Sequence, residues 1–244
     1  RHSFPTRRSS DLREARSELL AVYGLPVRVV PLRRADRRRT LPPRLYADSD
    51  ALWTAVAARA ADVAGQGRPV LVGTASVTES DALSVRLTAA GLAHVVLSAR
   101  HDGDEAAVVA AAGLPGRITV ATNMAGRGTD IALAAGCAAR GGLHVLACQL
   151  NAARRIDRQL AGRCARQGDP GSVETWLAAD MPLLRDGLPA WLVARSPSLP
   201  AWLLRSLWRR LQRREERLQT LQRRRLLMRD RQLERGLSFR GASD

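Results

Sequence analysis

Short continuous apolar runs alternate with helical periodicity through the middle of the chain. The runs predict strands with both faces buried, as in a parallel sheet covered by helices: PVLVGT, HVVLS, RITVATN, LHVLACQ and SVETWLA. Between them, apolar residues at helical spacing predict helices over about 77–90, 104–112 and 154–164. The alternation predicts an α/β fold built on a doubly wound parallel sheet.

The N-terminal part departs from this regular pattern. Residues 27–30 predict a strand, and the arginine-rich run 33–44 predicts an exposed loop. A helix is predicted next, capped by Asp48 or Ser49 and running to about Ala64.

The C-terminal part changes in composition beyond Asp180. Residues 181–200 are rich in proline and tryptophan and predict a linker, and a long helix is predicted from Ala201 to about Arg235. Its leucines share one face at spacings of three, four and seven: Leu204, Leu207, Leu211, Leu218 and Leu221. Because Arg214 interrupts this stripe, we expect a helix that lies along a partner surface rather than a free coiled coil.

These patterns divide the chain into four parts. Residues 1–12 differ in composition from the rest of the chain and are set aside as a leader that is either non-native or disordered. The α/β domain is expected over 13–180, the linker over 181–200 and the long basic helix over 201–244.

The basic residues of the chain are all arginine. The formal net charge is +16, and the 39 basic residues include no lysine. Such a charge suits nucleic acid, anionic lipid or an acidic protein surface as partner. The phosphate loop of a P-loop ATPase requires a lysine. Either that loop lies outside these residues or the protein hydrolyses no nucleotide.

The cysteines and the strand histidine receive structural interpretations. Cys137, Cys148 and Cys164 are odd in number and lack the close pairing of a zinc site, so we expect reduced, buried thiols and no metal site. His144 lies in a predicted buried strand and is expected to be a core residue. No apolar run reaches the roughly 18 residues that a transmembrane helix needs.

The segment ATNMAGRGTDI, residues 121–131, opens a glycine-rich loop at the end of a predicted strand. Ligands bind at that end of the strands in open parallel sheets. Gly126 and Gly128 allow the backbone to approach a phosphate closely, and Arg127 supplies charge. Asp130 can anchor the loop or a ribose. A short Gly-Arg-Gly turn with no ligand is the alternative.

A second segment, RRIDRQLAGRCARQGDPG, covers residues 154–171. On a helix, its polar residues at three- and four-residue spacing share a face: Arg155, Gln159, Arg163 and Arg166. Placed opposite the glycine loop, they would present guanidinium groups to a phosphate, as an arginine finger does. A solvated basic face is the alternative.

In order and spacing, these segments resemble motifs five and six of the SecA motor. The resemblance rests on TNMAGRGTDI, GGLHVLA and the arginine segment, and upstream on YGLPVRVVP, PVLVGTASVTES and AGLAHVVLSARH. The resemblance covers most of residues 18–180, and the C-terminal helix is similar to the start of SecA's helical scaffold. It implies a RecA-like second nucleotide-binding domain, the helicase-type second motor domain, followed by a long α-helix.

The resemblance also implies roles for individual residues. Arg166 matches the arginine finger, Arg163 a second phosphate-sensing arginine, and Asp169 a nucleotide contact. Residues 126–130 match the segment that couples nucleotide state to domain closure, and Gln159 matches a residue facing the cleft.

The chain departs from the family pattern at several positions. Ala161 replaces an arginine, and Cys164 and Ala165 stand where serine and glycine are usual. Ala165 matters most, because a methyl group can obstruct an approach that glycine permits. Thr74 and Glu79 lie in the loop that matches another family segment.

By resemblance, the function is that of an ATP-driven protein translocase. ATP with Mg²⁺ would be the cofactor, with the phosphate loop and the Mg²⁺ site supplied by a first motor domain outside this chain, which alone would be inactive. Preproteins and the translocon channel would be the partners, at the cytoplasmic face of the inner membrane, with anionic lipid as a further candidate. The alternatives are the second motor domain of a nucleic-acid helicase, which we do not favour, and a non-catalytic pseudo-ATPase.

Overall fold

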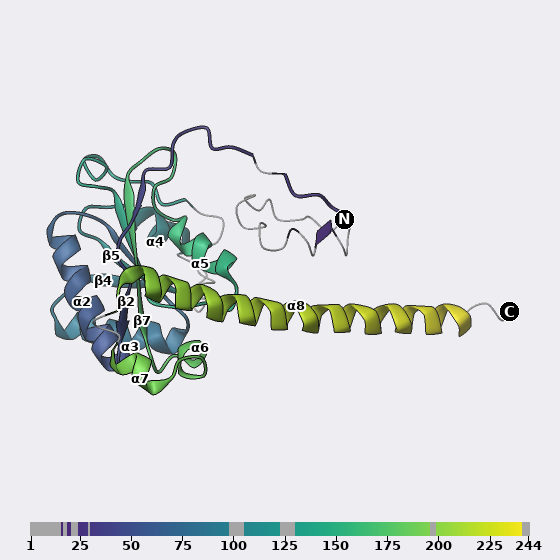
Figure 1. Cartoon of the computed structure of the whole chain (residues 1–244). Coiled ribbons are helices and arrows are strands. Elements are labelled where there is room, and N and C mark those ends of the chain that lie inside the picture. The colour runs from purple at the N-terminus through teal and green to yellow at the C-terminus, as the bar shows by residue number, and fades with distance from the viewer. Residues whose placement is uncertain are drawn as a thin grey trace.

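A parallel β-sheet with helices on both faces forms the body of the molecule, and one long helix leaves it (Figure 1). The computed structural model describes residues 16, 19–20, 24–28, 30–97, 105–122, 130–195 and 199–240, without the side chains of 105, 106, 190, 230, 231 and 234–240.

The sheet has seven strands, all paired in parallel, in the order β1-β7-β6-β3-β5-β4, with β2 also pairing with β7. The strands are β1 (Arg38–Thr40), β2 (Arg44–Tyr46), β3 (Val70–Thr74), β4 (His94–Leu97), β5 (Ile118–Thr122), β6 (Leu143–Ala147) and β7 (Gly171–Ala178). The helices are α2 (Ser49–Gly65), α3 (Val77–Ala89), α4 (Glu105–Ala111), α5 (Arg154–Ala161), α6 (Pro182–Arg185), α7 (Ala190–Ala194) and α8 (Ala201–Arg240).

Successive strand residues point to opposite faces, and two hydrophobic cores result. In β3, Val70 and Val72 pack with residues of α2, α3 and the start of α8, whereas Leu71 packs with α4 and the end of α5. We call these the α2 face and the α5 face. The prediction of a doubly wound parallel sheet with a long C-terminal helix is therefore confirmed.

The N-terminal prediction was wrong in detail. The described residues among 24–32 form no strand, while β1 and β2 lie inside or at the end of the run predicted as a loop. Both strands pair with β7, Arg38 opposite Gly171 and Arg44 opposite Trp176, so they form one edge strand interrupted between them. Two consecutive prolines occupy the interruption. Proline cannot donate to the ladder, and the edge of a sheet tolerates it. The prediction of a helix after this run is confirmed, with Asp48 accepting from Ala51 N (2.8 Å) at its N-cap.

The segment predicted as a linker contains α6 and α7, whose Leu184 and Leu192 are buried. The first turns of α8 continue this packing through Leu204 and Trp208, which lie in the core of the α2 face. The division into domains remains a prediction.

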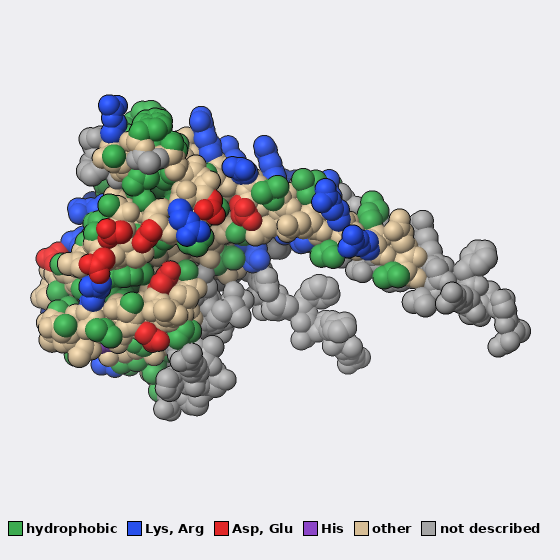
Figure 2. Space-filling model, turned by 90° about the horizontal axis from the view of Figure 1, so that it is seen from below, with side chains coloured by type: hydrophobic (Ala, Val, Ile, Leu, Met, Phe, Trp, Pro, Cys, Tyr) green, Lys and Arg blue, Asp and Glu red, His purple; other side chains and the backbone are tan. Residues whose placement is uncertain are grey.

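The apolar stripe of α8 is buried at its start alone. Leu207 and Leu211 are partly buried, but Leu218 and Leu221 are 46% and 52% exposed. The far part of α8 extends beyond the body, with arginine and hydrophobic side chains next to each other along it (Figures 1 and 2). The described residues contain no helix that is both long enough and apolar enough to span a bilayer.

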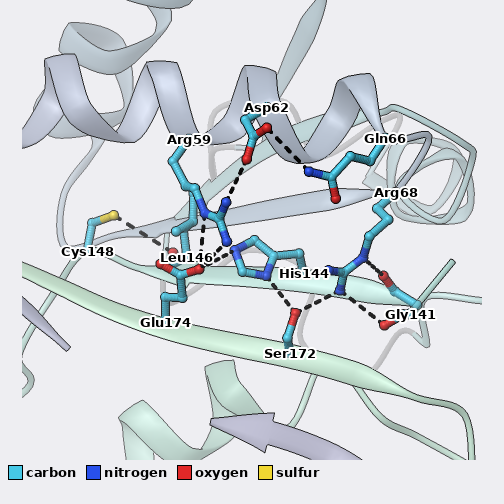
Figure 3. A network of polar contacts seen from close by, with 11 residues as sticks. Arg59, Asp62, Gln66, Arg68, Gly141, His144, Leu146, Cys148, Ser172 and Glu174 are labelled. Atoms are coloured by element: carbon cyan, nitrogen blue, oxygen red, sulfur yellow. Dashed lines mark hydrogen bonds and ion pairs between the residues drawn. The ribbon is translucent and has the colours of Figure 1, made fainter. Parts of the chain in front are cut away.

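A buried polar cluster ties α2 to β6 and β7 on the α2 face (Figure 3). Arg59 of α2 donates to Glu174 Oε1 from Nε (3.1 Å) and Nη2 (2.7 Å), and it also contacts Asp62. His144 Nε2 lies 3.5 Å from the same carboxylate oxygen. The Glu174 side chain is 6% exposed, so its charge is balanced by a guanidinium inside the protein.

The second half of this cluster joins Arg68 to His144 through one hydroxyl. Arg68 Nη2 donates to Ser172 Oγ (2.7 Å), and the same oxygen forms a hydrogen bond with His144 Nδ1 (2.7 Å). Burial, followed by the charges of Arg68 and Arg59, lowers the pKa of His144 to about 3, so the ring is neutral. The prediction that His144 is a core residue is confirmed.

The three cysteines are free thiols and all are buried, as predicted. Burial raises the pKa of Cys164 to about 11, which keeps its thiol protonated and unreactive at neutral pH.

Candidate functional site

Asp130 stands at the end of the glycine-rich loop. β5 ends at Thr122, and the predicted loop residues Gly126, Arg127 and Gly128 lie outside the described residues. Asp130 is exposed, and the next residue, Ile131, is buried in the core of the α5 face. The chain is therefore anchored immediately after the carboxylate.

The helix that carries the arginine segment is shorter than predicted. α5 ends at Ala161 with Gly162 as its C-cap, so Arg163 and Arg166 do not share a helical face with Gln159. The prediction of a continuous helix to residue 164 was wrong. After Gly162 the backbone turns through left-handed conformations that no helix can contain: φ is +56° at both Ala165 and Gln167.

We call residues 161–168 the finger loop. Within it, Arg166 Nε donates to Gly162 O (2.8 Å), and Nη1 forms an ion pair with Asp130 Oδ1. Gln167 Nε2 donates to the other oxygen, Asp130 Oδ2 (3.2 Å). The two motifs therefore meet, across 36 residues of sequence, through one carboxylate.

The other predicted site residues lie around this contact. Gln159 is on α5, Arg163 follows its C-cap, and the Asp169 N–H donates to Arg166 O (2.9 Å), so the turn continues through Asp169. Arg163, Gln159 and Asp169 are half-buried. Their predicted nucleotide contacts remain predictions.

The start of α5 is held by α8. Ala153 offers no side-chain cap, and Glu216 of α8 accepts from Arg154 N instead (2.9 Å). Gln212 of α8 donates to Asn151 O (2.9 Å) and to Asp157. A carboxylate at a helix N-terminus accepts a hydrogen bond from a backbone N–H that has no partner within the helix, and its negative charge complements the helix dipole. No sequence signal pointed to this cap, because its two partners are 62 residues apart.

Asp157 is the titratable group at this junction. Burial raises its pKa to about 6, against the hydrogen bonds from Asn151 and Gln212 and the charge of Arg154, which lower it. The contact between α5 and α8 therefore contains a carboxyl group whose charge changes near neutral pH.

Thr74 and Glu79 have local roles in the structure. Ser76 caps α3 by accepting from Glu79 N (3.2 Å), and Glu79 Oε2 accepts from the N–H of Ala75 (2.7 Å), the residue before the N-cap. Thr74 shares a hydrogen bond with Ser80 (2.7 Å) and is fully buried. These contacts account for both residues without a ligand.

The finger loop suits a phosphate group. A guanidinium has five N–H donors in a planar fork. Within the described residues, Arg166 uses two of these donors, Nε on Gly162 and one N–H of Nη1 on Asp130. Its side chain is 17% exposed, so it is partly withdrawn from water, where charge-assisted hydrogen bonds are stronger. Within the described residues, no group of three or more His, Cys, Asp and Glu side chains could hold a metal ion.

Comparison with known proteins identifies the family. The SecA P-loop domain matches residues 31–140 and 134–188. Protein translocase subunit SecA 2 of Magnetococcus marinus is 45% identical over 232 residues, 93% of this chain and 36% of that protein. The SecA 2 subunit of Nitrosospira multiformis is 43% identical over 240 residues, 95% of this chain and 36% of the relative. The chain belongs to the SecA family.

The SecA relatives are much longer than this chain, which spans a little over a third of their length. Among solved structures, the yeast DEAD-box splicing factor Prp28 superimposes with a TM-score of 0.50 over 79% of this chain and 42% of that chain, at 13% identity. That likeness concerns the fold alone. It agrees with the RecA-like fold expected for this part of SecA, and that prediction is confirmed.

Proposed function

We propose that this chain is the second nucleotide-binding domain of a SecA-type ATP-driven protein translocase, with the start of its helical scaffold. The observation that carries the proposal is the contact between Arg166 and Asp130, which joins the two motifs expected to face the nucleotide. ATP, when bound, supplies the phosphoanhydride bond whose hydrolysis drives the motor.

Arg166 is the proposed arginine finger. The Arg166 guanidinium would turn part of its fork from Asp130 toward a phosphate oxygen and offset charge that develops in the transition state. Arg163 and Asp169 would contribute further contacts, and the glycine loop at 126–128 would respond to nucleotide. The phosphate loop and the Mg²⁺ site would come from a first motor domain, since this chain has no lysine.

The α5–α8 junction supports a coupling role for this domain. Glu216 and Gln212 bind the start of the helix that leads directly into the finger loop. A shift of the finger loop on ATP hydrolysis would therefore reach α8 through α5. In the complete protein, work on preproteins at the translocon channel, on the cytoplasmic face of the inner membrane, would follow from that movement.

The test is ATP turnover by the complete protein with Arg166→Ala. Arginine fingers contribute about 10³ to 10⁵ in turnover, and we expect a loss in that range with ADP affinity changed by less than about threefold. Arg185→Ala is the matched control, because Arg185 is exposed and pairs with its neighbour Asp186 alone among the described carboxylates. Turnover of Arg166→Ala within about threefold of the unsubstituted protein contradicts the assignment.

A pseudo-ATPase is the second candidate, favoured by one observation. Ala165, next to the finger, has the left-handed φ of +56° that glycine adopts without strain. If the complete protein binds ATP but hydrolyses none, and Ala165→Gly restores no turnover, the non-catalytic interpretation replaces the motor.

A further inference from the structure

Three arginines of the N-terminal run reach the finger loop. Each donates a hydrogen bond to one of its backbone carbonyls: Arg34 Nη1 to Gln167 O (2.6 Å), Arg37 Nη1 to Gly168 O (3.4 Å) and Arg38 Nη1 to Ala161 O (3.2 Å). The partners in these bonds are 123 to 133 residues apart in sequence. The run predicted as an exposed loop therefore binds both ends of the loop that carries Arg166.

The finger loop needs such support because its backbone is strained. Ala165 and Gln167, on either side of Arg166, both have φ of +56°, a conformation that costs an L-residue about 1–2 kcal/mol. Strained conformations persist where the surroundings hold them. The short bond from Arg34 fixes the carbonyl of Gln167, which belongs to one of these two residues.

Arg34 also packs against the loop with its aliphatic stem. Gly168 has φ of +90°, and a Cβ atom built there would lie 2.9 Å from Arg34 Cδ. The glycine thus serves two purposes, a left-handed turn and contact with the arginine. A side chain at this position would push the Arg34 stem away from the loop.

Arg38 supports the other end of the finger loop. Ala161 is the last residue of α5, and a cation near a helix C-terminus satisfies an orphan carbonyl and complements the dipole. Arg38 is held by an ion pair with Asp36 (2.8 Å) and by its place in β1 opposite Gly171. It therefore connects the edge of the sheet to the first residue of the loop.

We propose that Arg34 and Arg38 are positioning residues for the Arg166 finger. They fix the backbone of the finger loop, while Asp130 holds the guanidinium itself. The inference rests on the proposed function, because it assumes that Arg166 acts on a phosphate in the transition state. A displacement of about 1 Å in such a group can lower a rate by 10²-fold without loss of binding.

The experiment uses the complete protein with Arg34→Met, Arg34→Lys and the control Arg33→Met. Arg33 is an exposed neighbour that makes no side-chain hydrogen bond within the described residues. We expect Arg34→Met to lower kcat by roughly 10- to 100-fold, with KM for ATP and affinity for ADP within about twofold. Affinity for ADP with aluminium fluoride should fall with kcat, because it reports binding of the transition state. Lysine, which can still donate to the Gln167 carbonyl, should restore part of kcat, and Arg33→Met should match the unsubstituted protein.

A second readout is independent of catalysis. Amide hydrogen exchange of the peptide over 161–168 should be faster in Arg34→Met than in Arg33→Met, with the melting temperature unchanged. If the unsubstituted protein hydrolyses ATP and Arg34→Met retains kcat within about twofold, the inference is overturned. If the unsubstituted protein hydrolyses no ATP, the proposed function fails, and amide hydrogen exchange alone then tests whether Arg34 holds the finger loop. Unchanged protection of the 161–168 peptide in Arg34→Met overturns that role, and lost protection supports it. Arg38→Met is the second variant, expected to act in the same direction.

Discussion

Two arginine–carboxylate clusters occupy opposite faces of one sheet and differ in how completely they are enclosed. On the α2 face, Glu174 is 6% exposed and meets Arg59 and the ring of His144 (Figure 3). On the α5 face, Asp130 is 46% exposed and meets Arg166 at the surface. Both clusters pair an arginine with a carboxylate, but their surroundings differ.

Their backbones differ as well. Glu174 lies in the middle of β7, within a regular ladder to β6. Arg166 lies between Ala165 and Gln167, the two non-glycine residues with positive φ in the described part of the chain. Strain of this kind concentrates at functional sites. The comparison teaches that pairing an arginine with a carboxylate does not by itself mark a site, and that the strained loop backbone is what separates the proposed site from the enclosed cluster.

The largest effect should come from removing the enclosed carboxylate. Glu174→Ala removes the two hydrogen bonds that Arg59 donates to the buried carboxylate and leaves the guanidinium with Asp62, and hydrogen bonds to charged groups contribute about 1.5–3 kcal/mol each. Urea unfolding of the 244-residue chain measures the free energy of unfolding.

Two exposed carboxylates sharpen that comparison. Asp62 binds the same guanidinium as Glu174, but its side chain is 56% exposed. On the α5 face, the Asp130 side chain that binds Arg166 is 46% exposed. Asp62→Ala and Asp130→Ala should each change the free energy of unfolding by less than about 1 kcal/mol. An equal cost for all three variants would show that burial does not distinguish the clusters.

The next effect is a pH dependence of opposite sign in two regions. The pKa of His144 is about 3 in the folded protein and 6.5 for a free histidine side chain, so the unfolded chain binds more protons between these values. Stability from this group is complete above about pH 6.5 and is lost as the pH falls toward 3, by at most about 1.4 kcal/mol per pH unit. His144→Gln should flatten this acid limb of the stability curve.

Asp157 reverses the sign. Its pKa is raised from 3.8 to about 6, so its contribution to stability is complete below 3.8 and is lost as the pH rises through 6. The free energy of unfolding of the unsubstituted chain should therefore fall relative to that of Asp157→Asn as the pH rises from about 4 to about 7. Denaturant titrations at several pH values measure both slopes, and equal signs for the two variants would contradict the burial of one of these groups.

The smallest effect concerns strain in the finger loop. Ala165→Gly relieves a left-handed conformation worth about 1–2 kcal/mol but adds about 0.4–1 kcal/mol of entropy to the unfolded chain, so we expect a net gain of roughly 0.5 kcal/mol. Ala60→Gly, in the interior of α2, is the matched control and should lose about 1 kcal/mol. A loss at both positions, in the same urea titrations, would mean that Ala165 is not strained.

Much of the candidate site was predictable from local patterns. The glycine loop and the arginine segment each carry residue types at a spacing typical of phosphate chemistry, and Arg166 and Asp130 were both singled out. Their direct contact was not predicted, because an ion pair across 36 residues depends on how both segments cross the α5 face. The helix end at Ala161 was also missed, since the arginines beyond it continue the helical spacing that local periodicity measures.

The sequence by itself determined the buried strands, the main helices and their alternation, because apolar periodicity reflects which side of each element must leave water. It also determined the helix cap at Asp48, which acts within four residues. Only the tertiary structure decided that Arg34 and Arg38 bind the finger loop, that Glu216 caps α5, and that the edge strands β1 and β2 form beside β7. Each of these depends on partners more than about 60 residues away. A hydrogen bond between distant segments does not alter the spacing of apolar residues in either segment. It therefore cannot be predicted from local sequence patterns and is found only in the folded structure.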